Sequence, residues 1–204
     1  MDSLHRLEEI FSHFPGIGPR QAKRFVYYLL NKSQASIKEF TQLIEDVRKS
    51  THECSQCHRF FAEGSKKVSS VCPICSDTSR DQTTLMIVAR DSDYESVERS
   101  GAYKGLYFIL GGAVPVLDKE PEKRIRLEKL LEFISKAKQL NEIILSMNTT
   151  PDGDHTADIV REAVNKITEG KSVKITVLGR GLSTGAELEY VDRDTIENAL
   201  RNRN

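Results

Sequence analysis

Four cysteines arranged as two Cys-x-x-Cys pairs constrain this chain more than any other feature. The pairs are Cys54–Cys57 and Cys72–Cys75, fourteen residues lie between them, and the chain has no other cysteine. Each pair can direct two thiolates at one centre, and two pairs complete the closed four-sulfur tetrahedron that Zn²⁺ prefers. No coordination position is left for water, so we expect one structural zinc ion per chain.

Two disulfides or free thiols are the alternatives to a metal. A disulfide within one Cys-x-x-Cys pair closes too small a ring to cross-link much of the chain, and such pairs otherwise occur as redox motifs. His52 and His58 are rival ligands, but four sulfurs fill the site, so we expect both imidazoles to be solvated. A thiolate site in a chain with a charged N-terminus, unlike a secretory signal, indicates a reducing cytosol.

The composition indicates a modest core and no overall charge. Of the 204 residues, 38% are hydrophobic and 29% are charged, and 30 Lys and Arg balance 30 Asp and Glu. The balance argues against a globally basic nucleic-acid binder but leaves room for a local basic patch. No apolar run approaches the roughly 18–20 residues of a membrane helix, so we expect a soluble protein without a membrane partner.

Hydrophobic spacing predicts an α/β fold. Residues 1–50 repeat apolar side chains at helix spacing, whereas residues 51–80 carry little core of their own. From Thr84 onwards, short apolar runs alternate with amphipathic stretches, which indicates a parallel sheet covered by helices. The predicted strands are 85–89, 107–110, 143–145 and 173–178, and the predicted helices are 93–99, 122–140, 156–167 and 194–201.

A glycine-containing turn follows the first helical stretch. Gly16 and Gly18 allow positive φ and leave the backbone bare, and the next residue, a proline, suits the first turn of a helix. Arg20, Lys23 and Arg24 share a side of that helix, near an N-terminus that favours phosphate. The pattern predicts a helix-hairpin-helix element that binds the nucleic-acid backbone without reading sequence. The alternative is a structural hairpin that packs against another subunit and touches no DNA.

Short motifs along nearly the whole chain point to one family. They are Pro15-Gly16-Ile17-Gly18-Pro19, the four cysteines, Arg80-Asp81, Gly101-x-Tyr103-x-Gly105-Leu106-Tyr107, Leu110-Gly111-Gly112, Thr156-Ala157, Gly179-Arg180-Gly181-Leu182 and Gly185-Ala186-Glu187-Leu188-Glu189-Tyr190-Val191-Asp192. In this order they resemble the RecR family of bacterial recombination mediators. The combination is far more specific than any one of the motifs.

The resemblance implies four segments. They are a helix-hairpin-helix domain at 1–52, a four-cysteine zinc finger at 53–80, a Toprim domain with a Rossmann-like parallel sheet at 81–178, and a Walker B-like oligomerisation segment at 179–204. The resemblance also implies a homodimer that pairs into a ring-shaped homotetramer and binds single- and double-stranded DNA. Such a protein acts with RecO, and sometimes RecF, to load RecA on single-stranded gaps in the nucleoid of the cytoplasm.

A carboxylate of catalytic Toprim domains is missing here. By the same resemblance, those domains place a Glu after the first strand and an Asp-x-Asp after a later one to gather Mg²⁺. This chain has Ala89 in place of the Glu and keeps Asp152 and Asp154. A positioned acid–base group contributes about 10²–10⁴-fold to a reaction, so we expect a scaffold and not an enzyme. Asp152 and Asp154 either form a weak Mg²⁺ site or are acids that complement a helix dipole.

Two other stretches bear on partners. Residues 115–121 replace the family's Gly-Ile-Gly-Pro with charged residues and a proline, so the contacts of that loop are expected to differ. Residues 179–185 lack the Gly-Lys-Ser/Thr of a phosphate loop, which argues against nucleotide hydrolysis. The C-terminal segment is expected to reach a neighbouring subunit, and an ordinary surface loop is the alternative.

Two rival functions stand beside the DNA-binding mediator. A Mg²⁺-dependent Toprim nuclease or primase-like enzyme predicts strand scission or nucleotide transfer that disappears with Asp152→Asn, and Ala89 argues against it. An oligomeric adaptor would use its hairpins only for assembly and leave the DNA to a partner. It predicts that replacing Arg20 and Arg24 by Ala leaves the oligomer and DNA binding of the complex unchanged.

Overall fold

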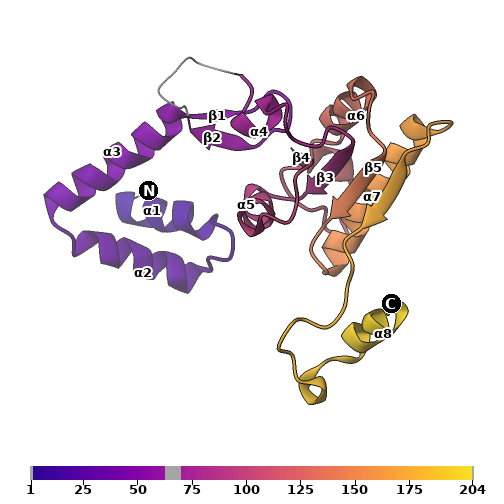
Figure 1. Cartoon of the computed structure of the whole chain (residues 1–204). Helices are drawn as coiled ribbons and strands as arrows, with labels where there is room; N and C mark the ends of the chain where they lie inside the picture. The colour runs from indigo at the N-terminus through magenta and orange to yellow at the C-terminus, as the bar shows by residue number, and fades with distance from the viewer. Residues whose placement is uncertain (1, 63–69, 204) are drawn as a thin grey trace. The chain divides into compact units, whose positions relative to one another are not determined.

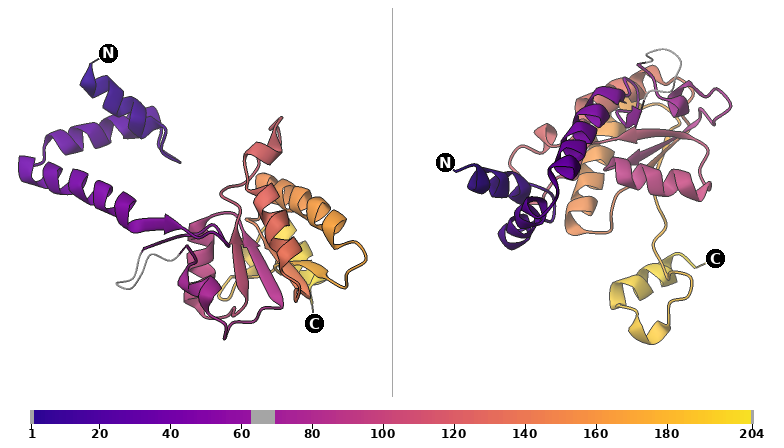
Figure 2. Two further views of the ribbon diagram at one scale, coloured as in Figure 1. Left: turned by 90° about the horizontal axis from the view of Figure 1, so that it is seen from above. Right: turned by 90° about the vertical axis from the view of Figure 1, so that its left-hand side faces the viewer.

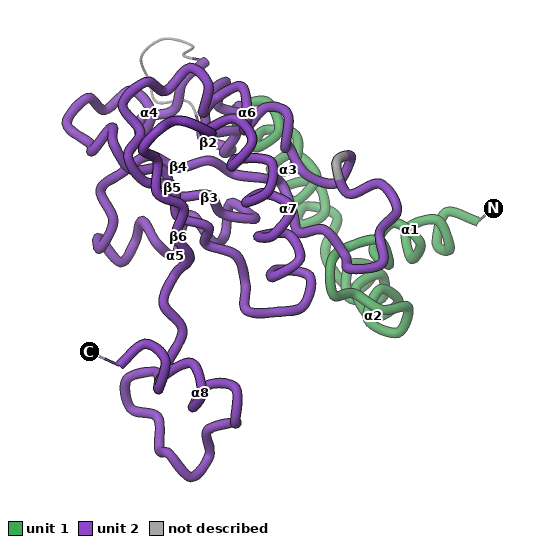
Figure 3. Tube along the Cα trace, turned by 90° about the vertical axis from the view of Figure 1, so that its right-hand side faces the viewer, with its two compact units in different colours: residues 1–51 green, residues 52–204 purple. Residues whose placement is uncertain are grey.

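The computed structural model of the chain describes residues 2–62 and 70–203. It divides into two compact units, residues 1–51 and 52–204 (Figure 3). Part of the cysteine segment predicted at 53–80, namely residues 63–69, lies outside the described residues. Within the described ranges, no helix combines the length and the apolar character that crossing a membrane requires.

The first unit consists of three helices, as the apolar spacing predicts. They are α1 (Ser3–Ser12), α2 (Pro19–Leu30) and α3 (Gln34–Ser50). The side chain of Ser33 caps α3 by accepting a hydrogen bond from the amide of Ser36 at 3.2 Å. Between α1 and α2, Gly16 has φ +75°, a conformation that a glycine adopts at little cost. This turn brings the two helices together, with Ala22 and Val26 buried.

The second unit is built on a four-stranded parallel sheet, which confirms the predicted α/β class. The strands β3 (Thr84–Val88), β4 (Leu106–Ile109), β5 (Glu142–Ser146) and β6 (Lys174–Val177) lie in the order β4-β3-β5-β6 (Figure 1). In the register of the sheet, Leu85 pairs with Leu106 on one side and with Ile143 on the other. Both β3 and β4 are almost continuously buried, as expected for strands covered on two faces.

Alternate residues of β3 enter two separate hydrophobic clusters. Leu85 and Ile87 pack with side chains of α6 (Leu127–Lys136) and α7 (Pro151–Thr168). Met86 and Val88 point to the other face, which α5 (Asp91–Ser100) covers together with three of the cysteines. The layers are visible in Figures 1 and 2, where α6 and α7 lie on one side of the sheet and α5 on the other.

Two helices differ most from the predicted ranges. The helix predicted at 122–140 is a 3₁₀ turn at Pro121–Lys123 followed by the shorter α6, because the amide of Arg126 donates to the carbonyl of Leu110 at 2.8 Å outside any helix. The helix predicted at 156–167 begins earlier, at Pro151. Thr150 caps that helix by accepting from the amide of Gly153 at 3.1 Å.

The remaining elements are short. A two-stranded sheet joins β1 (Thr51–Glu53) to β2 (Phe60–Ala62), and α4 (Pro73–Ser76) follows the third cysteine. After β6 the chain continues through a 3₁₀ turn at Leu188–Tyr190 into α8 (Arg193–Arg201). Asp192 caps α8 by accepting from the amide of Thr195 at 2.9 Å, so the last helix begins one residue before the predicted range of 194–201.

Candidate functional site

The four cysteines converge on one point, as their spacing predicts. Their sulfur atoms all lie within 4.8 Å of one another, and the Sγ atoms of Cys57 and Cys72 are 3.6 Å apart. Cys54, Cys57 and Cys72 are fully buried, and Cys75 is half-buried. In the described part of the chain, this is the one cluster of three or more Cys, His, Asp or Glu side chains that could hold a metal ion.

Electrostatics within the cluster favour a cation. Hydrogen bonds from the neighbouring thiols of Cys57, Cys72 and Cys75 lower the pKa of Cys54. Hydrogen bonds with Cys54, Cys72 and Cys75, together with burial, raise the pKa of Cys57. A soft divalent metal would allow all four sulfurs to ionise together. The donor set therefore fits a structural metal ion.

The prediction that both neighbouring histidines are solvated is wrong. His58 is only 8% exposed, packs edge-on against Phe108 with the ring centroids 5.4 Å apart, and has a positive φ of 61°. Its Nδ1 lies 2.7 Å from the carboxylate of Glu53, which an Arg126 guanidinium also approaches at 3.4 Å. His52 is half-buried. His58 therefore packs beside the cysteine cluster, between Glu53 and Phe108, and is not one of the four side chains that could hold the metal.

The cysteine cluster forms part of the cover of the sheet. The amide of Ile109, in edge strand β4, donates to the carbonyl of Cys57 at 2.9 Å. The amide of Phe60 donates to the carboxylate of Asp91 at 2.9 Å, and Arg59 donates to the hydroxyl of Tyr94. These bonds attach the segment to β4 and to α5, so the metal site and the sheet share one hydrophobic cluster.

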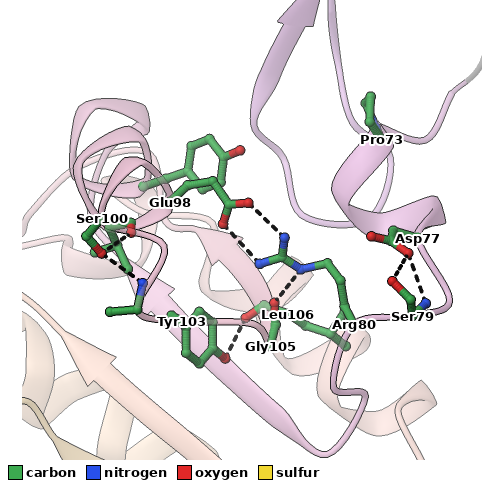
Figure 4. A network of polar contacts seen from close by, with 12 residues as sticks. Pro73, Asp77, Ser79, Arg80, Glu98, Ser100, Tyr103, Gly105 and Leu106 are labelled. Atoms are coloured by element: carbon green, nitrogen blue, oxygen red, sulfur yellow. Dashed lines mark hydrogen bonds and ion pairs between the residues drawn. The ribbon is translucent and has the colours of Figure 1, made fainter.

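An arginine whose side chain is only 8% exposed fixes the chain just before the sheet begins. Arg80 donates to both carboxylate oxygens of Glu98 in α5, at 2.8 and 3.0 Å, and to the carbonyl of Gly105 at 3.0 Å (Figure 4). Beside it, the Tyr103 hydroxyl donates to the carbonyl of Leu106 at 2.9 Å, and burial raises its pKa to about 12. A side chain at Gly105 would collide with Thr84 and Tyr103, which explains that glycine.

At the carboxyl ends of the strands, the acidic side chains already have protein partners. Ala89 is buried at the end of β3 and offers no oxygen ligand from its side chain. The carboxylate of Asp152 accepts from the amide of Val116 at 3.0 Å, and Asp93 accepts from the amide of Arg90 at 2.9 Å. Asp152 and Asp154 lie in the first turn of α7, where a negative charge complements the helix dipole.

Arg180 is a partner of Asp154 that sequence reasoning missed. The guanidinium pairs with the carboxylate across 26 residues of sequence, and the bond raises the pKa of Arg180. The carbonyl of Arg180 in turn accepts from the side chain of Asn202 at 2.7 Å. A cavity of about 610 Å³ lies here, lined partly by Asp154, Arg180 and Asp192. The C-terminal segment is thus attached to the end of the sheet by an ion pair.

The altered loop at 115–121 is held at its base and open at its tip. Besides the bond from Val116 to Asp152, Asp118 accepts from the side chain of Arg124 at 2.6 Å. Leu117 lies between these anchors and is 92% exposed. The loop therefore displays one apolar side chain from a fixed base.

In the first unit, the three predicted DNA-binding cations are exposed on α2. Gly18 begins this helix as its N-cap, and Arg20, Lys23 and Arg24 follow within the first two turns. Among residues 2–62 and 70–203 no ion pair involves any of them, and the one polar contact is from Arg24 to Gln21 at 3.4 Å. No acidic residue occurs in α2. This face of the helix is therefore uniformly positive.

Three family models match the chain and together cover most of it. The model described as RecR, helix-hairpin-helix matches residues 4–48, the Toprim domain model matches residues 83–179, and the model described as RecR, C-terminal matches residues 181–204. The match at 83–179 coincides with the parallel sheet and its helices. The helical hairpin and the C-terminal helix thus match two models of the RecR family, and the sheet matches a Toprim domain.

Curated relatives agree over nearly the full length. The chain is 30% identical over 200 residues to the "Recombination protein RecR" of Lactobacillus acidophilus, covering 98% of this chain and 96% of that protein. It is 34% identical over 198 residues to the protein of the same name from Chloroflexus aggregans, covering 97% and 91%. Together with the helices, the four-cysteine cluster and the Toprim sheet, these matches show that the chain belongs to the RecR family of recombination proteins.

Proposed function

We propose that this protein is a non-enzymatic recombination and repair mediator that binds DNA through the backbone. Gly16 and Gly18 would bring amides close to a phosphate, and Arg20, Lys23 and Arg24 would contact neighbouring phosphates. The positive, unpaired face of α2 carries this proposal. Backbone contacts are independent of sequence, so single- and double-stranded DNA would both bind, with strong dependence on salt.

The double variant Arg20→Ala, Arg24→Ala tests the proposal directly. We expect its affinity for DNA to fall about tenfold or more, because a hydrogen bond to a charged group contributes about 1.5–3 kcal/mol. The slope of log affinity against log salt should also decrease by about 1 for each phosphate that the variant no longer neutralises. Fluorescence anisotropy with a labelled oligonucleotide at about 50 to 200 mM salt measures both quantities.

A matched control separates this local effect from a change in net charge. Lys138→Ala, Lys171→Ala removes the same charge from exposed positions of the second unit and should leave affinity and slope unchanged. Equal affinities for wild type and the Arg20, Arg24 variant, with an intact oligomer, would favour the adaptor that leaves DNA to a partner.

We propose a division of labour among the four segments. Residues 1–52 would bind DNA and a second subunit, residues 53–80 would brace the fold around one zinc ion, residues 81–178 would act as the scaffold, and residues 179–204 would join subunits. Dimers pairing into a ring-shaped tetramer would bring several copies of the α2 face to one DNA, so weak contacts would add up. RecO, and in some settings RecF, would then direct the assembly to gaps for loading of RecA.

Zinc is the metal that we propose for the cysteine cluster. Four thiolates within 4.8 Å match its tetrahedral preference and leave no position for a substrate. When bound, the ion would supply folding free energy and no reaction step. We place the protein in the cytoplasm with the nucleoid, since thiolate sites persist in a reducing compartment and DNA is the expected partner.

The enzyme alternative has its own test. A Mg²⁺-dependent Toprim nuclease or primase-like activity would need Asp152 and Asp154, whose carboxylates contact Val116 and Arg180 in the structure. We expect no strand scission by the purified protein with Mg²⁺. Scission that disappears with Asp152→Asn would contradict the mediator and favour that alternative.

A further inference from the structure

Helix α2 carries two consecutive exposed tyrosines in different surroundings. Tyr28 lines an apolar groove of about 540 Å³ together with Phe25, Leu29 and Phe40, and Lys32 lies 4.3 Å from its ring centroid. Tyr27 does not line that groove, although 48% of its surface is exposed. The two rings therefore face different neighbours, and Tyr27 needs a separate explanation.

Helix geometry places Tyr27 within the positive face. Tyr27 follows Lys23 by four residues, Arg24 by three and Arg20 by seven, and residues at these spacings share one side of a helix. The ammonium of Lys23 lies 5.9 Å from the centroid of the Tyr27 ring. The buried residues Ala22 and Val26 lie on the other side of α2. The exposed ring of Tyr27 thus shares its side of α2 with three cations, and the helix carries no acidic residue.

We propose that Tyr27 is a stacking platform for a base of single-stranded DNA. Proteins that bind single strands combine a positive surface for the backbone with an aromatic ring for the bases. The cations of α2 would position the backbone, and the ring of Tyr27 would then favour strands whose bases are free to stack. This inference rests on the proposed DNA binding by Arg20, Lys23 and Arg24, and it adds a preference for unpaired bases.

The experiment compares two single strands that differ only in their bases. One is an ordinary oligonucleotide, and the other has the same length and phosphates but abasic sugars. We expect wild type to bind the ordinary strand more tightly, and Tyr27→Ala to weaken that binding by about 5- to 100-fold, the range for loss of one base–aromatic stack. Its binding to the abasic strand should stay unchanged.

Two further variants make the result specific. Tyr27→Phe keeps the ring and should retain the ratio of the two affinities. Tyr28→Ala removes the neighbouring ring and should also retain that ratio, because Tyr28 faces the groove. A ratio that Tyr27→Ala leaves unchanged would overturn the stacking proposal, whether Tyr27 contacts a second subunit or nothing.

Failure of the underlying proposal would look different. If phosphate contacts by α2 are absent, the Arg20, Arg24 variant keeps its affinity for both strands. If those contacts exist but Tyr27 does not stack, that variant weakens both strands and Tyr27→Ala leaves the preference for the ordinary strand as it was. The two outcomes are therefore distinguishable with the same pair of oligonucleotides.

Discussion

The two units of this protein use their apolar side chains in opposite ways. In the second unit, strands β3 and β4 are almost fully buried and lie at the centre of the two hydrophobic clusters. Within the described residues of the first unit, 2–51, Ala22 and Val26 are the only buried apolar residues, while large apolar side chains stay open to solvent. On α3, Phe40, Leu43, Ile44 and Val47 are between 46% and 60% exposed.

This difference indicates which unit buries part of its apolar surface against another molecule. Single exposed apolar side chains are ordinary, but a contiguous exposed apolar face is typical of an interaction surface. The second unit is stabilised internally by the four-cysteine cluster and two hydrophobic clusters. In the first unit, the apolar side chains of α3 stay exposed, which supports the proposed pairing of subunits there.

The largest effect should come from removing one cysteine of the second unit. Cys72→Ser takes away one of four ligands, and structural zinc contributes about 10–16 kcal/mol to folding in small metal domains. We expect loss of metal by elemental analysis and unfolding or aggregation of residues 52–204. Ser55→Ala, an exposed neighbour in the same segment, should keep its metal. A metal-free Cys72→Ser protein with unchanged thermal unfolding would contradict a structural role.

A pair of leucine variants sharpens the comparison between the units. Leu130 is fully buried under the sheet, so Leu130→Ala should destabilise by about 2–5 kcal/mol at any protein concentration. Leu43 is 54% exposed, so Leu43→Ala should cost little at high dilution and more as subunits associate. Denaturant unfolding at several concentrations measures both. A Leu43 effect independent of concentration would argue against pairing through α3.

A smaller, pH-dependent effect is expected from the ion pair between Arg80 and Glu98 in the second unit. The hydrogen bond from Arg80 lowers the pKa of Glu98 below its ordinary value of 4.5. A lowered carboxyl pKa stabilises the fold above pH 4.5, and this contribution disappears as pH falls through the folded-state pKa. Glu98→Gln should therefore reduce stability at pH 7 and flatten its decline below pH 4.5. Wild-type and variant stability curves that coincide at every pH would show that the Arg80–Glu98 pair contributes nothing, and a constant offset between them would contradict the expected pH dependence.

Local sequence patterns predict the cysteine cluster and the strands well. They do not predict ion pairs between residues that are far apart in the sequence. The residue type and the spacing of the cysteines are enough to predict their site. Strand β3 can be predicted because it is a run of apolar residues. The bonds from Arg80 to Glu98 and from Arg180 to Asp154 join residues 18 and 26 positions apart. No periodicity encodes such pairs, because they depend on how the elements come together.

The errors also have physical causes. Sequence reasoning predicts a solvated His58 because four sulfurs already fill the metal site. In the structure, its ring contacts Glu53 and Phe108 and is buried. The helix predicted at 122–140 is too long because the amphipathic pattern begins before the helix does. The amide of Arg126 donates to the carbonyl of Leu110 and not to a carbonyl of the helix, so α6 begins only at Leu127. The positions of Arg20, Lys23 and Arg24 on α2 follow directly from helix spacing, whereas their binding to DNA stays a prediction.

The bond from Ile109 to the carbonyl of Cys57 has a consequence for how this protein can evolve. It occupies an amide on the outer edge of β4, where a bare strand would invite pairing with other chains. Exchanging the cysteine segment for an unrelated module would uncover that edge and the aromatic surface beneath it. We therefore expect the cysteine segment to be exchangeable only together with the sheet that it covers.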